Sequence, residues 1–292
     1  MTIFASIKRM LRLLLPPILI EGTRSVWYTF RQPLLEHVPN RQPLLEYAPD
    51  GWQTFEINSQ ITGWSVESVV DAERTKWEAF CRNLQGSGAL GFSHEYTDLS
   101  VVRNVSFHNI HLTYAYVLAL GAHQKSMLSV LDWGGGLGHY YLIGQALLPD
   151  VTLDFHCKEV PLIAEAGKQL NPNVHWYVDE SCLERAYDLV MINGSLQYIE
   201  DWADTLRRIA PAVKSYLFLT RLPVVDHGPG FVAIQRVYGA EMLHQQLNQA
   251  AVLQVVEETG LHLMREFVVG DRLYIKNAPE PFELRGWLFK RM

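Results

Sequence analysis

The chain has few cysteines and no excess of basic charge. Its 292 residues include three cysteines, Cys81, Cys157 and Cys182, which lie far apart and form no C-x-x-C motif. This usage argues against a disulfide framework or a zinc knuckle and fits a reducing cytoplasm. The formal net charge is −6 and no block of lysine and arginine runs along the body of the chain. We therefore expect no nucleic-acid partner.

A long apolar run is also missing. Lys8, Arg9 and Arg12 precede an apolar stretch in MTIFASIKRMLRLLLPPILI, as in a signal peptide, but Pro16 and Pro17 break the stretch and it is too short to cross a bilayer. Its apolar residues share one helical face. Residues 1–20 could therefore contact an anionic membrane surface peripherally, or dock on the protein's own core.

Residues 1–105 are predicted to be an accessory region. They contain a tandem repeat at residues 31–50, RQPLLEHVPN followed by RQPLLEYAPD. Two copies are too few for a solenoid, and the four prolines favour an extended loop. A helical pattern follows at residues 66–84. From its position ahead of the main domain, we expect this region to cover the acceptor pocket.

Residues 106–292 are predicted to form an α/β domain. After a helical stretch that ends at residue 123, short apolar runs alternate with helical segments; the runs are SMLSVLDW, VTLDFHCKEV, VHWYVD, YDLVMIN and SYLFLTRL. This alternation predicts a Rossmann-like, doubly wound and mostly parallel sheet with helices on both faces. The final runs, LHLMREFVV and FELRGWLFK, have no long helix between them and predict an antiparallel pair that ends the sheet.

A glycine-rich loop follows the first strand of this domain. The stretch VLDWGGGLGHYY, residues 130–141, carries Gly134, Gly136 and Gly138 behind Asp132. The spacing D-x-G-x-G-x-G differs from the G-x-G-x-x-G of pyrophosphate sites, and the carboxylate would repel a pyrophosphate. It could attract a cationic ligand or the amides of the loop. A plain tight turn is the structural alternative.

Acidic residues also end the next two strands. Glu159 lies about twenty residues past the glycines, where a carboxylate takes both ribose hydroxyls of a nucleoside. Asp179, at the end of VHWYVD, is placed to meet an adenine amino group, although exposed acids at strand ends are common. Together with Asp132, these residues predict a site for a nucleoside that carries positive charge.

Three segments, LDWGGGLG, KEV and YDLVMINGSLQYIED, resemble the first, second and fourth motifs of class I S-adenosylmethionine-dependent methyltransferases. More narrowly, DWGGGLGHYY, EVP, SLQYIED and TRLP are similar to the methyltransferases of bacterial surface-polysaccharide clusters for O-antigen and capsule. The tandem repeat is not part of that pattern. The resemblance implies S-adenosylmethionine as cofactor, a saccharide or lipid-linked saccharide as acceptor, and a cytoplasmic location, free or peripheral to the inner membrane.

The resemblance also assigns the cofactor-binding residues. It places Asp132, Gly134, Gly136 and Gly138 in the cofactor loop and Glu159 at the ribose. Asn193, Gly194 and Ser195, after the fourth strand, would flank the methionine end of the cofactor. An acceptor would meet the methyl group beside this second loop.

A sugar hydroxyl is a poor nucleophile at neutral pH, so a general base is expected to help its methylation. His227, in TRLPVVDHGPGF, is our first candidate because it follows the fifth strand, with a solvated loop histidine as the alternative. His139 is the second candidate. Arg221 could bind an anionic acceptor or stabilise a developing alkoxide, or it could form a surface ion pair.

Further polar residues complete the prediction. Gln197 and Tyr198 could hydrogen-bond the acceptor, although Tyr198 could equally pack under its loop. His108 and His111 are three residues apart on a helix, but no third ligand accompanies them, so we expect no metal. The sequence leaves the oligomeric state open.

Three functional hypotheses follow. The favoured one is a methyltransferase that O-methylates a sugar of a surface polysaccharide. A catalytically inactive, methyltransferase-like binding subunit of a glycan-assembly complex is the alternative, because fold alone does not establish catalysis. A nucleotide-sugar or NAD enzyme on the same sheet is disfavoured by Asp132.

Overall fold

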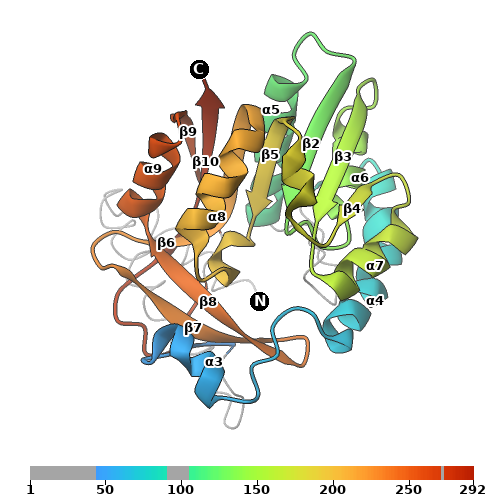
Figure 1. The fold of residues 1–292 in the computed structure, drawn as a ribbon. Helices are drawn as coiled ribbons and strands as arrows, with labels where there is room; N and C mark the ends of the chain where they lie inside the picture. The colour runs from blue at the N-terminus through green and yellow to red at the C-terminus, as the bar shows by residue number, and fades with distance from the viewer. Residues whose placement is uncertain (1–43, 91–104, 271–272) are drawn as a thin grey trace, which may run out of the picture. The chain divides into compact units, whose positions relative to one another are not determined.

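The computed structural model describes residues 44–90, 105–270 and 273–292 (Figure 1). The chain divides into two compact units, residues 1–42 and 43–292, and only the second is described. The membrane-contact segment predicted at residues 1–20 and the first copy of the repeat lie outside the described residues. Within the described residues, no helix is long and apolar enough to cross a membrane.

The centre of the second unit is a parallel sheet of five strands. These are β2 (Met127–Trp133), β3 (Thr152–Lys158), β4 (His175–Tyr177), β5 (Tyr187–Asn193) and β6 (Val213–Val225). Their order is β6-β5-β2-β3-β4, with parallel pairing throughout. The chain runs from β2 outward to β4 and then adds β5 and β6 on the other side of β2, so the sheet is doubly wound and its switch point lies at the carboxyl ends of β2 and β5.

The sheet branches at β6, and one of its two branches ends in the predicted antiparallel pair. Strand β10 (Glu283–Arg291) runs antiparallel to β6, and β9 (Leu261–Val268) runs antiparallel to β10. The predicted fold class, a Rossmann-like α/β sheet that is mostly parallel with an antiparallel last pair, is therefore confirmed.

Helices cover both faces of the sheet, as Figure 1 shows. Helices α5 (Val105–Gly121) and α6 (His139–Leu147) bury apolar side chains on one face. Helices α8 (Trp202–Ile209) and α9 (Gln249–Glu258) do so on the other face. Each large apolar side chain that is fully buried stabilises the folded protein by about 1.5–3 kcal/mol. The helices thereby fix the strand ends that carry the site.

The remaining elements surround this core. Helix α7 (Pro161–Leu170) begins with a proline, which suits the first helical turn because its missing N–H would have no helical partner there. It packs beside β4 and against α4. The other elements are α3 (Thr54–Ile57), α4 (Glu67–Gln85), η1 (Gly51–Gln53), η2 (Glu180–Glu184), η3 (Leu196–Tyr198) and η4 (Ala210–Ala212).

The sequence did not predict the hairpin of β7 (Gly230–Val237) and β8 (Ala240–Asn248). These strands pair antiparallel along their whole length. The turn between them has positive φ angles at Tyr238, 54°, and Gly239, 74°, which matches the backbone twist of a two-residue hairpin. The strands were missed because β8 buries polar residues such as His244 and Gln246, which obscures the alternation expected of a half-buried strand.

Residues 44–90 pack against the sheet domain within the second unit. Strand β1 (Leu45–Tyr47), from the second copy of the repeat, pairs antiparallel with β7. Helix α4 packs on α6 and α7. The predicted domain boundary after residue 105 falls at the start of α5 and directly follows residues 91–104, which lie outside the described residues.

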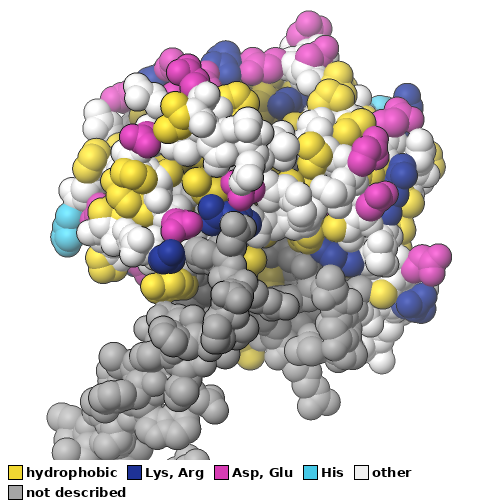
Figure 2. Space-filling model, turned by 90° about the horizontal axis from the view of Figure 1, so that it is seen from below, with side chains coloured by type: hydrophobic (Ala, Val, Ile, Leu, Met, Phe, Trp, Pro, Cys, Tyr) yellow, Lys and Arg dark blue, Asp and Glu magenta, His cyan; other side chains and the backbone are white. Residues whose placement is uncertain are grey.

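Charges of both signs are mixed on the described surface. In Figure 2, basic and acidic side chains are interspersed with apolar ones over the visible face. On that face, no field of a single sign dominates the described residues.

The three cysteines are free thiols.

Candidate functional site

The carboxyl ends of three parallel strands meet at one edge of the sheet. Gly134 follows β2 and donates its N–H to the Lys158 carbonyl at 2.8 Å; Glu159 follows β3 and donates to the Tyr177 carbonyl at 2.9 Å. Gly194 follows β5 and donates to the Thr220 carbonyl at 2.9 Å. These hydrogen bonds align the loops in which the sequence placed its candidate residues.

A cavity of about 620 Å³ opens at this edge. Its wall is formed by the glycine loop, the ends of β3 and β5, helix α4 and the β7–β8 hairpin. The predicted residues in the wall are Asp132, Gly134, Gly136, Glu159, Asn193, Ser195, Gln197, Tyr198 and Arg221. The structure thus brings most of the predicted site together.

Asp132 is the most unusual group of the cavity. Its side chain is fully buried, and neither carboxylate oxygen has a hydrogen-bond partner among the described residues. Burial, and next the negative charge of Glu159, raise the pKa of Asp132 to about 8. A buried carboxylate without partners is costly, and a cationic ligand would reduce that cost.

The glycine loop lies directly over this carboxylate. Gly134 has a φ of +76°, and a Cβ atom on it would lie 2.3 Å from the Ser195 Cβ. A Cβ on Gly135 would lie 2.5 Å from an Asp132 carboxylate oxygen. Side chains are excluded at both positions, so backbone forms this side of the cavity. Gly138 precedes α6 at its N-terminus.

Glu159 is held against the glycine loop. Its Oε1 accepts the Gly136 N–H at 3.1 Å, and its Oε2 accepts the Val160 N–H at 2.5 Å. Burial raises the pKa of Glu159 in spite of these hydrogen bonds. Each carboxylate oxygen has a second lone pair. Both oxygens can therefore also accept hydrogen bonds from a pair of hydroxyl groups.

The loop after β5 supplies amide and hydroxyl groups. Ser195 donates its hydroxyl to the Trp133 carbonyl at 2.6 Å, which ties this loop to the glycine loop. The Asn193 Oδ1 and Gln197 Oε1 are buried without a hydrogen-bond partner among the described residues. These acceptors suit a ligand that donates hydrogen bonds.

Arg221 lies in β6 at the cavity wall. Its backbone is left-handed, with a φ of 56°, which is uncommon for a residue with a side chain and costs free energy. The guanidinium lies over the Phe107 ring at 5.8 Å. Strain of this kind at a cavity wall marks a position that the surrounding structure holds in place.

The far wall contains residues that sequence analysis missed. Tyr198 donates its hydroxyl to the Gln235 Oε1 at 2.6 Å. Its ring packs edge-on against Trp64, with centroids 5.0 Å apart, and against His244, at 5.3 Å. Trp64, Gln235, Tyr238 and His244 also line the cavity. The Tyr238-Gly239 turn could have revealed the hairpin that carries Gln235, Tyr238 and His244.

His244 is a neutral histidine inside the cavity wall. It is 2% exposed, and burial lowers its pKa to about 4. Its Nδ1 lies 2.6 Å from the Gln246 Nε2. A hydrogen bond therefore joins the two buried side chains.

Other predicted residues lie away from the cavity wall. His227 is exposed in the turn between β6 and β7. Asp179 is exposed and caps η2, where its Oδ1 accepts the Ser181 N–H at 3.0 Å. His139 is buried between the rings of Trp77 and Phe80, at centroid distances of 5.0 and 4.8 Å. The roles assigned to these residues stay predictions.

His111, one of the two histidines considered for a metal, is tied into the structure. The His111 Nδ1 lies 2.6 Å from the Leu90 carbonyl oxygen, and burial lowers the pKa of His111 to about 4.

Solved structures resemble the fold of this chain, but the sequence comparisons found no relatives. No family model and no curated protein matches the chain. The magnesium protoporphyrin IX methyltransferase of Synechocystis PCC 6803, solved with bound S-adenosylhomocysteine, is 15% identical and has a TM-score of 0.46; the match covers 77% of this chain and 98% of that one.

Two further solved structures are similar. A Galdieria sulphuraria protein described as a sarcosine dimethylglycine methyltransferase is 14% identical, with a TM-score of 0.47 and coverage of 76% of this chain and 98% of that one. The Burkholderia thailandensis 1,6-didemethyltoxoflavin-N1-methyltransferase, with bound S-adenosylhomocysteine, is 15% identical, with a TM-score of 0.43 and coverage of 62% and 77%. Likeness at this level transfers no substrate to this chain.

Proposed function

We propose that the protein is an S-adenosylmethionine-dependent methyltransferase. The observation that carries this proposal is the buried Asp132 carboxylate, which has no partner among the described residues and lies under the glycine loop of a large cavity. A ligand with a permanent positive charge fits this position better than a pyrophosphate does. Glu159, which lines the same cavity, fits the hydroxyls of a ribose.

The cofactor, when bound, supplies an electrophilic methyl group. The described residues bind it, orient its ends and exclude water. Asp132 would attract its cationic part, Glu159 would accept hydrogen bonds from its ribose, and the loop after β5 would bind its polar end. Asn193 offers a buried acceptor oxygen for that purpose.

The acceptor in this proposal is a saccharide of a bacterial surface polysaccharide, or its lipid-linked precursor, at the cytoplasmic face of the inner membrane. The wall opposite the glycine loop combines aromatic rings with amide groups; its residues include Trp64, Tyr198, Tyr238, Gln197 and Gln235. Rings and planar amides together suit a sugar, which has apolar faces and a rim of hydroxyl groups. The motifs shared with polysaccharide-cluster methyltransferases support the same class.

His244 would orient the acceptor rather than deprotonate it, because burial lowers its pKa to about 4 and makes the imidazole a weak base. Transfer would then depend on alignment of the hydroxyl with the methyl group. The same weak basicity favours the second candidate, an inactive binding subunit. Binding of the cofactor without turnover would support that alternative.

The test of the cofactor is calorimetric titration with S-adenosylmethionine, S-adenosylhomocysteine and, as a control, NAD. We expect micromolar binding of at least one methionine derivative and none of NAD. Binding of NAD alone, or silence toward all three, would contradict the proposed cofactor.

Replacement of Glu159 by alanine should weaken cofactor binding at least ten-fold, on the order of 1.4 kcal/mol, because the ribose hydroxyls lose their acceptors. Glu165→Ala is the matched control, since Glu165 is exposed on the neighbouring α7. Equal affinities of the two variants in the same titration would refute the ribose assignment.

Replacement of His244 by glutamine should raise the KM for the saccharide and lower kcat while the Kd of the cofactor stays unchanged, because only acceptor alignment is lost. His227→Gln tests the base predicted from the sequence in the same assay of S-adenosylhomocysteine release. If His227→Gln lost kcat while His244→Gln kept normal kinetics, His227 would be the general base.

A further inference from the structure

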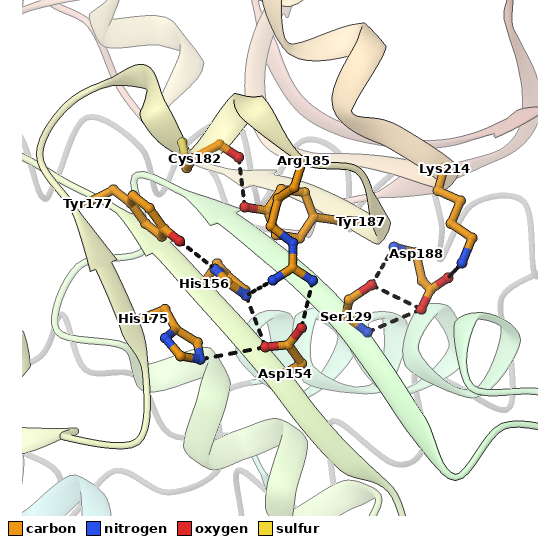
Figure 3. A network of polar contacts seen from close by, with 10 residues as sticks. All are labelled: Ser129, Asp154, His156, His175, Tyr177, Cys182, Arg185, Tyr187, Asp188 and Lys214. Atoms are coloured by element: carbon orange, nitrogen blue, oxygen red, sulfur yellow. Dashed lines mark hydrogen bonds and ion pairs between the residues drawn. The ribbon is translucent and has the colours of Figure 1, made fainter.

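A cluster of metal-ligating side chains lies outside the cofactor cavity, on the edge of the sheet formed by β3 and β4 (Figure 3). Asp154 and His156 come from β3, and His175 opens β4. One ligand atom from each residue lies within 4.8 Å of those of the other two. The sequence did not reveal this group, because β3 and β4 are separated by a helix in the chain.

Two of the three ligand-atom separations suit a tetrahedral ion. The Asp154 Oδ1 lies 3.0 Å from the His156 Nε2 and 3.6 Å from the His175 Nε2. Bonds of about 2.0–2.1 Å to a tetrahedral metal place neighbouring ligand atoms roughly 3.3 Å apart. The two measured separations lie on either side of that value.

The hydrogen bonds around His156 conflict without a metal. Its Nε2 lies 3.0 Å from the Arg185 Nη1 and 3.0 Å from the Asp154 Oδ1. A guanidinium only donates and a carboxylate only accepts, so one ring nitrogen cannot serve both well. The Nδ1 lies 3.0 Å from the Tyr177 hydroxyl. If Nδ1–H donates to Tyr177, the Nε2 lone pair faces the carboxylate, which is the arrangement of a metal-binding histidine with its supporting hydrogen bond.

We propose that Asp154, His156 and His175 bind a divalent transition-metal ion of the zinc type. Two imidazole nitrogens and one carboxylate oxygen are a common ligand set for such ions, and the fourth position would face water. Arg185 now occupies part of this space as a competing cation. Its side chain is 46% exposed, so it can turn outward, and its Nη2 already donates to the other carboxylate oxygen, Oδ2, at 2.8 Å.

The ion would hold β4 on the sheet. Strand β4 has three residues and, among the described strands, pairs with β3 alone, with His175 opposite His156. Coordination of both histidines therefore joins the two strands at the start of their pairing. Binding to the folded state alone raises the midpoint of thermal unfolding as the metal concentration increases.

The test uses the full, untagged chain stripped of metal and titrated with Co²⁺, whose visible absorption reports tetrahedral coordination, and with Zn²⁺ in competition. We expect one ion per chain, with a thermal midpoint that rises with Zn²⁺. His175→Gln should lose this binding and the midpoint shift; His175 is 61% exposed, so its replacement leaves the core intact. His123→Gln, an exposed histidine after α5, should bind as the natural protein does.

Arg185→Gln provides a second measurement. Removal of the competing guanidinium should tighten Zn²⁺ binding at least several-fold, which a purely structural role for Arg185 does not predict. Unchanged binding in His175→Gln would overturn the site. So would the absence of binding in the natural protein, including the case in which only Arg185→Gln binds, because Arg185 would then be the permanent occupant.

Discussion

Replacement of Asp132 by asparagine should stabilise the ligand-free protein at pH 8 and above, on the order of a few kcal/mol. The pKa of Asp132 is raised to about 8 in the folded protein, against about 3.9 in an unfolded chain. Between these values the folded state binds more protons than the unfolded state, so stability falls as the pH rises from about 4 to about 8. Asparagine has no charge to bury and should remove this fall, which denaturant unfolding at several pH values would measure.

The same variant should bind S-adenosylmethionine at least ten-fold more weakly. In the natural protein, affinity for this cation should increase with pH up to about 8, because ionised Asp132 attracts it, and S-adenosylhomocysteine, which lacks the sulfonium charge, should show a smaller increase. Titrations between about pH 6 and pH 9 would follow both ligands. If the affinities for the two ligands changed equally with pH, Asp132 would not recognise the positive charge of S-adenosylmethionine.

Asp188 provides a matched control at the opposite end of the sheet. Burial alone would raise its pKa, but hydrogen bonds from Lys125, Ser129 and Lys214 outweigh burial and lower the pKa to about 2. Its ionised form therefore stabilises the fold above pH 4, and this stabilisation is lost as the pH falls toward 2. Asp188→Asn should destabilise the protein at neutral pH. A loss of stability in both variants would contradict the cost assigned to Asp132.

Replacement of Gly134 by alanine should destabilise the protein on the order of 3 kcal/mol and abolish cofactor binding. The residue has a φ of +76°, and the new Cβ would lie 2.3 Å from the Ser195 Cβ. The loop after β5 must then move away from the glycine loop, which breaks the hydrogen bond from Ser195 to the Trp133 carbonyl. Thermal unfolding and calorimetry would measure the two effects.

Gly88→Ala is the control for that substitution. A Cβ on Gly88 would have no other atom within 4 Å, and the φ of this residue is not positive, so alanine should leave both stability and binding unchanged. If Gly134→Ala behaved in the same way, the close approach of the two loops would play no part in holding the cofactor.

Much of the fold could be predicted because its signals are local. The apolar runs that became β2, β3, β5 and β6 are long enough to identify as strands, and the helical segments between them required a parallel sheet. The glycine loop could be placed for the same reason, since Asp132 and Gly134 follow a strand directly. These features depend on residues that are close together in the sequence.

The rest of the site depends on contacts between distant segments. His244 comes to the cavity on the β7–β8 hairpin, which folds back beneath the sheet ends, as Figure 1 shows for the hairpin. Trp64 follows Thr62 and Gly63, whose N–H groups donate to the Glu241 carbonyl of that hairpin. His227 was chosen from its position after the fifth strand, yet β6 continues to Val225 and leaves His227 on an exposed turn. The pairing of β7 with β8 decides both outcomes, and its buried polar residues concealed it.

Because of the β7–β8 hairpin, the two walls of the cavity can change independently in evolution. Asp132 and Glu159 lie on strand ends whose geometry the whole central sheet determines, whereas Gln235, Tyr238 and His244 lie on a ribbon attached beside it. Substitutions or length changes in that ribbon can alter one wall while the opposite wall keeps its shape. Evolution could therefore exchange one acceptor for another in related proteins without rebuilding the part that binds the methyl donor.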